Sequence, residues 1–110
     1  LTHATIYWVN NSIATSMRYY ANANRYAWTP AHDRTPVVQA PVGLTFVTYE
    51  NPPGIHTADD RVRAFVTGRQ ADWFNHVNVN AHDHGGHFIP WENPDAWVSD
   101  LRRTFHGRRP

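Results

Sequence analysis

The feature that most constrains the fold is the apolar run at residues 42–49, which reads Val-Gly-Leu-Thr-Phe-Val-Thr-Tyr. It is rich in β-branched and aromatic residues, carries no charge, and stops at Glu50-Asn51-Pro52-Pro53-Gly54. Runs of this kind are typical of strands buried on both faces, which occur mainly in parallel sheets. We therefore expect an α/β fold in which this strand belongs to a parallel sheet.

A helix and a second strand are predicted after this run. Thr57 has the character of an N-cap, acidic residues follow it in the first turn, and Gly68 marks the end of the helix. Residues 74–81 then alternate in polarity, which predicts a strand. On this pattern one face carries Val77, Val79 and Ala81, and the other carries His76, Asn78 and Asn80.

The last helix has the clearest signals in the sequence. Asn93 is the expected N-cap, Pro94 suits the first helical position, and Gly107 closes the helix. We expect its buried stripe to consist of Trp97, Val98, Leu101 and Phe105.

The first part of the chain is of a different kind. Apolar residues recur at helical spacing over residues 4–23, which predicts either one helix or two, with Ser12 near the start of the second. Prolines then mark an irregular connection up to residue 41. Two parallel strands and two helices leave both sheet edges open, so we expect further strands from chain outside this sequence.

Polar residues follow both predicted strands at the point where each strand ends. Glu50 comes directly after the first, and the turn His84-Gly85-Gly86-His87 comes after the second. Because the carboxyl ends of parallel strands meet at one edge of a sheet, we expect Glu50 and His87 to lie within hydrogen-bonding reach. A carboxylate beside an imidazole orients it as a base that takes a proton from water. The competing interpretation is that both are incidental loop residues.

Composition excludes several classes of function. A formal net charge of +1 argues against a nucleic-acid binder, since phosphate-driven affinity needs clustered cations. The absence of cysteine excludes disulfides and thiolate metal sites and fits a cytoplasmic protein. No apolar run is long enough to span a membrane, so we expect no membrane partner.

The three histidines around the glycine pair allow a second hypothesis. His82, His84 and His87 are a possible set of zinc ligands, since imidazole suits Zn²⁺. Zinc sites of this kind usually take further ligands from distant loops, and the other histidines form no second motif. This hypothesis stands as an alternative, beside that of an inactive remnant that only binds a partner.

Three motifs in order resemble the C-terminal end of epoxide hydrolases of the α/β-hydrolase superfamily, especially the microsomal-type branch. They are Gly85-Gly86-His87-Phe88 with the downstream Glu92-Asn93-Pro94, the strand from Pro41 to Glu50, and the segment Ser16-Met17-Arg18-Tyr19-Tyr20. The resemblance covers nearly the whole chain. It implies that residues 1–30 are the end of the lid and that residues 31–110 are the C-terminal part of the hydrolase core.

The resemblance implies a role for each site residue and no metal or organic cofactor. His87 is expected to be the general base, Glu50 its acidic partner, and Tyr20 the lid tyrosine that polarises the epoxide oxygen, with Tyr19 as the alternative. The substrate is then a small-molecule epoxide, which is opened through an Asp ester. The family's nucleophile elbow has no counterpart in this chain, so we expect the chain to need the remainder of the hydrolase domain. Another hydrolase of the superfamily, a haloalkane dehalogenase or an esterase, is the closest alternative.

Overall fold

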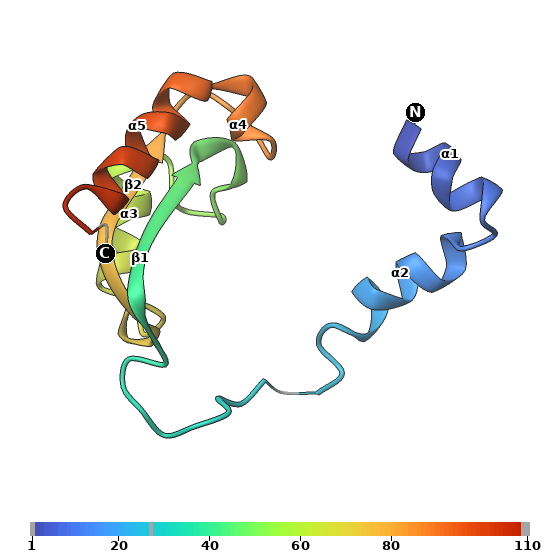
Figure 1. The fold of residues 1–110 in the computed structure, drawn as a ribbon, viewed down its shortest axis with the longest axis horizontal. Coiled ribbons are helices and arrows are strands. Elements are labelled where there is room, and N and C mark those ends of the chain that lie inside the picture. The colour runs from blue at the N-terminus through green and yellow to red at the C-terminus, as the bar shows by residue number, and fades with distance from the viewer. Residues whose placement is uncertain (1, 27, 109–110) are drawn as a thin grey trace. The chain divides into compact units, whose positions relative to one another are not determined.

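The computed structural model describes residues 2–26 and 28–108, and its contacts divide the chain into two units, Leu1–Ala31 and His32–Pro110 (Figure 1). The division lies next to the boundary that the sequence predicts between residues 30 and 31. That the first unit is a lid stays a prediction.

The first unit contains two helices, α1 (Thr2–Val9) and α2 (Ile13–Asn22). Asn11 has a positive φ of 51°, which no helix interior permits, and so the helical periodicity breaks there. The amide and the hydroxyl of Ser12 both donate to the carbonyl of Tyr7, at 2.9 and 3.3 Å. Of the two predicted alternatives, the pair of helices with Ser12 at the start of the second is the one observed.

The second unit has the predicted order of strand, helix, strand, helix. Its elements are β1 (Val38–Val47), η1 (Thr48–Glu50), α3 (Ala58–Val66), η2 (Ala71–Trp73), β2 (Phe74–His82), α4 (Ile89–Glu92) and α5 (Pro94–Phe105). Strands β1 and β2 are parallel neighbours, with Phe46 opposite Ala81 and Val47 opposite His82. This confirms an α/β arrangement with a small parallel sheet.

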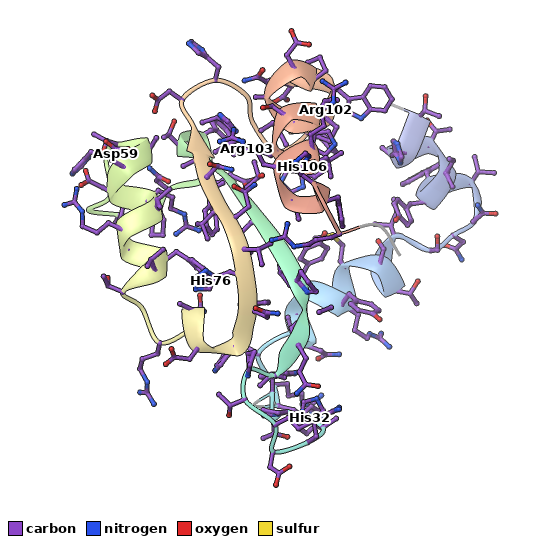
Figure 2. The ribbon with its side chains drawn as sticks, turned by 60° about the vertical axis from the view of Figure 1, so that its left-hand side comes forward. His32, Asp59, His76, Arg102, Arg103 and His106 are labelled. Carbon is purple, nitrogen blue, oxygen red and sulfur yellow. The ribbon has the colours of Figure 1, made fainter. Side chains whose placement is uncertain are left out.

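Helices α3 and α5 cover opposite faces of the two strands (Figure 1). On the α3 face, the buried ring of Phe65 packs against Phe46 at a centroid distance of 5.4 Å and against His76 at 5.8 Å. His76 accordingly lies on the α3 side of the strands, away from Arg102 and His106 of α5 (Figure 2). The result is a three-layer arrangement with the sheet in the middle.

An irregularity in β2 corrects the predicted strand faces. Val42 pairs with His76 but Gly43 pairs with Asn78, so Val77 is an extra residue in β2. A bulge of this kind reverses the alternation of side chains along a strand. His76 therefore faces α3, whereas Asn78 and the later even-numbered residues face α5. The prediction that His76, Asn78 and Asn80 share one face was wrong for this reason.

Two predictions about burial were also wrong. Strand β1 is less buried than the apolar run at residues 42–49 predicts: residues 38–41 are exposed, residues 44–46 are half-buried, and only Val47 is buried. Helix α5 buries the polar Asp100 and Thr104 towards the sheet, while Val98, Leu101 and Phe105 are exposed. The helix turns its polar stripe inwards because β1 and β2 present polar groups to it.

The predicted helix starts are confirmed in detail. The Thr57 hydroxyl accepts a hydrogen bond from the Asp60 amide at 3.1 Å, and the Asn93 side chain accepts one from the Ala96 amide at 3.4 Å. These caps satisfy amides that a helix start leaves unpaired. None of the helices in the described part of the chain is both long and apolar enough to cross a membrane.

Candidate active site

Glu50 is placed by the end of β1. The strand stops at the buried Val47, and a single 3₁₀ turn, Thr48–Glu50, carries the chain away from the sheet. Asn51 closes this turn with a hydrogen bond from its amide to the carbonyl of Thr48 at 3.1 Å. Pro52 and Pro53 then prevent the strand from continuing. The carboxylate is thus fixed at the carboxyl-terminal edge of the sheet.

His87 is placed by a turn with two adjacent glycines. Gly85 has a φ of +108°, a conformation that other residues rarely adopt. A Cβ at Gly86 would lie 2.8 Å from the Glu92 carboxylate, which accepts a hydrogen bond from the Gly86 amide. Glycine is therefore favoured at the first position by its backbone conformation, whereas at the second a side chain would displace only the end of the flexible Glu92 side chain.

The sheet edge brings the two predicted residues together. His87 Nδ1 lies 2.6 Å from Glu50 Oε1, as the strand order predicts. A carboxylate can only accept, so Nδ1 carries the proton in this contact and Nε2 is left with its lone pair when the ring is neutral. Within the described residues Nε2 has no hydrogen-bond partner. An oriented imidazole with a bare nitrogen is the arrangement that general-base catalysis requires.

The pair is open to solvent. The side chains of His87 and Glu50 are 72% and 49% exposed. The His87 ring also makes an edge-to-face contact with the Phe88 ring, with the two centroids 5.0 Å apart. Water screens the attraction of such a pair, so its value is orientation more than stability. Beside it lies a small cavity of about 160 Å³, whose walls include Arg61 with its guanidinium 4.1 Å from the centre of the Phe46 ring.

The predicted epoxide-polarising tyrosines lie on α2 in the first unit. Tyr20 is 80% exposed and Tyr19 is 86% exposed. Both line an apolar groove of about 850 Å³ between α1 and α2, which Tyr7, Ile13 and Met17 also line. Neither side chain is buried in helix packing. The role of Tyr20, or of Tyr19 in its place, stays a prediction.

A polar cluster around Asp100 was missed from the sequence. The carboxylate is buried, with the side chain 3% exposed, and it is contacted by four side chains from three elements. These are Thr45 at 2.8 Å, Asn80 at 3.0 Å, His82 at 2.7 Å and Arg103 at 2.8 Å. The available signal was the alternation of Asn78, Asn80 and His82 along β2, which places three polar side chains on one face of a strand.

The zinc alternative gains no support from the geometry. In residues 2–26 and 28–108, no three side chains of the metal-binding types come close enough together to hold an ion. His82 Nε2 is occupied by Asp100 and His87 Nδ1 by Glu50, so the two rings are committed to different carboxylates.

No known protein family matches this sequence, and no solved structure matches its fold.

Proposed function

We propose that this chain is the C-terminal part of an α/β-hydrolase that hydrolyses an epoxide to a vicinal diol. The observation that carries the proposal is the 2.6 Å contact between His87 Nδ1 and Glu50 Oε1 at the carboxyl ends of two neighbouring parallel strands. Ligand-binding and catalytic groups of open α/β sheets gather at this edge.

The order of the motifs supports the epoxide-opening branch. The Ser16–Tyr20 segment, the strand that ends in Glu50 and the Gly-Gly-His-Phe turn follow each other as in those enzymes. The exposure of both tyrosines of α2 is compatible with contact to a substrate, since neither hydroxyl is used in packing. The fold supports only the coarser class, α/β with a parallel pair of strands.

The proposed reaction has two steps. In the first, an aspartate supplied by the remainder of the hydrolase domain attacks an epoxide carbon, and the carbon–oxygen bond of the ring breaks. The Tyr20 hydroxyl donates to the oxygen as negative charge develops on it. The product of this step is an ester between the aspartate and the opened substrate.

In the second step, His87 Nε2 takes a proton from water, and the resulting hydroxide attacks the carbonyl carbon of the ester. Glu50 stabilises the imidazolium that forms and keeps the ring oriented. The ester bond between the carbonyl carbon and the substrate oxygen breaks, the diol leaves, and the aspartate is regenerated. The proton on His87 passes to the departing alkoxide, and the second proton of the water, left on the aspartic acid, passes by way of Tyr20 to the oxygen of the opened epoxide ring.

An isotope experiment on the complete enzyme tests this proposal. A single turnover of an epoxide such as styrene oxide in H₂¹⁸O should give a diol without ¹⁸O, because both diol oxygens come from the epoxide and the aspartate. The label should appear instead in the protein. A labelled diol would mean direct attack by water, and the absence of any epoxide turnover would reject the proposed activity.

A further inference from the structure

The Asp100 cluster joins the two strands just before they deliver the site residues. Thr45 lies near the end of β1, five residues before Glu50, and His82 is the last residue of β2, five residues before His87. Both donate to the same oxygen, Asp100 Oδ2, at 2.8 and 2.7 Å. Val47 and His82 are also partners in the strand register. One buried carboxylate therefore bridges the two strand ends.

The turn that carries His87 is attached to the region of α4 and α5 at three points. His82 is bonded to Asp100, the carbonyl of His84 accepts from Asn93 Nδ2 at 3.2 Å, and the amide of Gly86 donates to Glu92. Every second residue from His82 to Gly86 is thus held, and His87 follows directly.

The Asp100 carboxylate needs its partners because a buried charge is costly unless it is paired and hydrogen-bonded. Its Oδ1 atom is satisfied by Asn80 and by Arg103, whose side chain is 54% exposed. The contact between Oδ2 and His82 is therefore not needed to neutralise the charge. It is the contact that ties the start of the turn to α5.

We propose that Asp100 and His82 are positioning residues for the His87–Glu50 pair. Their contact holds the start of the turn so that His87 Nδ1 meets Glu50. The effect on catalysis rests on the proposed function, because it acts through the base of that reaction. The effect on the tautomer of the His87 ring does not rest on the proposed function, since it concerns only the geometry of this chain.

The first test measures which His87 nitrogen carries the proton in the 110-residue chain. Long-range ¹H–¹⁵N spectra, recorded at a pH where the ring is neutral, distinguish the two tautomers. In His82→Leu and Asp100→Asn, the ¹⁵N chemical shifts of His87 should move at least about halfway towards their values in Glu50→Ala. The reason is that the hydrogen bond to Glu50 sets which tautomer the ring adopts. His82→Gln, whose amide nitrogen can replace Nε2 as a donor, should keep the wild-type values.

Arg103→Gln is the matched control, because it removes a contact to the other oxygen of the same carboxylate. Arg103→Gln should leave the ¹⁵N chemical shifts of His87 unchanged. Circular dichroism should show that all the variants retain the wild-type helix content. Wild-type His87 values in folded His82→Leu would overturn the proposal. If Asp100→Asn fails to fold, the comparison of His82→Leu with His82→Gln still decides whether the His82 contact positions His87.

The second test uses the complete enzyme and separates the two chemical steps. His82→Leu should form the Asp ester in wild-type amount and hydrolyse it about tenfold to a hundredfold more slowly, as expected for a small misplacement of a catalytic group. Unchanged ester hydrolysis would overturn the catalytic part of the proposal. Failure of the wild-type enzyme to form any ester would reject the proposed function instead, and the tautomer measurement would still decide the positioning.

Discussion

Glu50 and His87 are 37 residues apart in the sequence, and yet their side chains meet at 2.6 Å through Oε1 and Nδ1. The parallel arrangement of β1 and β2 produces this contact, since both strands end at the same edge of the sheet. The contact leaves Nε2 of the imidazole available for chemistry.

Replacement of His87 by alanine should separate the two proposed steps. In the complete enzyme, His87→Ala should still form the Asp ester but should hydrolyse it about 10²–10⁴-fold more slowly, the usual contribution of a general base. Mass spectrometry of the intact protein after incubation with an epoxide should show the added mass of the substrate. Normal turnover by His87→Ala would contradict its assignment as the base.

Glu50 should contribute to the same step through the orientation of His87. Glu50→Gln retains an acceptor but loses the negative charge that stabilises the imidazolium, so ester hydrolysis should slow by roughly tenfold to a hundredfold. Ester formation, measured in the first turnover by rapid quenching, should stay near the wild-type rate. If Glu50→Gln slowed ester formation as much as hydrolysis, the carboxylate would have another role.

Tyr20 should act in the other step. Tyr20→Phe removes the hydroxyl that we propose donates to the epoxide oxygen, so ester formation should slow by about 10²–10³-fold, as for the loss of one oxyanion donor. Ester hydrolysis should be little changed, which is measured by following the decay of the isolated ester. Tyr19→Phe is the matched control, and a larger effect from Tyr19→Phe would transfer the role to that residue.

Gly43 should be essential for the packing of α5 on β1. A Cβ at this position would overlap the Thr104 side chain, with Thr104 Cγ2 at 2.8 Å, and Thr104 is itself buried. Gly43→Ala should lower the free energy of unfolding of the 110-residue chain by about 1–3 kcal/mol, as overpacking does. Urea denaturation followed by circular dichroism measures the change.

Gly54→Ala provides the comparison for that experiment. Gly54 has a φ of +89° and no atom within 4 Å of an added Cβ, so only conformational strain is expected, on the order of 1–2 kcal/mol. If Gly43→Ala had the same midpoint of urea unfolding as the wild type, α5 would not be packed on β1 as described.

The sequence predicted the elements that local signals specify. The caps at Thr57 and Asn93 and the breaks at Gly68 and Pro52 depend on neighbouring residues, and the structure has helices and strands where these signals place them. The meeting of Glu50 and His87 was also predictable, because it follows from strand order alone. The strand order thus predicted a hydrogen bond between two residues that are far apart in the sequence.

Long-range packing was the part that local patterns did not predict. The bulge at Val77 reverses the faces of β2, and no residue near it signals a bulge, since the alternation in the sequence continues through it. The burial of Asp100 was missed for a related reason. An aspartate on a helix is usually exposed, and its burial becomes favourable only when Thr45, Asn80 and His82 converge on it from two strands.

The most direct test of the site is the position of the proton on His87 in the isolated 110-residue chain. Long-range ¹H–¹⁵N spectra of the neutral ring should show the proton on Nδ1, held there by Glu50, with Nε2 bare. In Glu50→Ala the proton should move to Nε2, the position that a free imidazole prefers. A wild-type ring that already carries its proton on Nε2, with no change in Glu50→Ala, would contradict the paired arrangement and the hydrolase interpretation built on it.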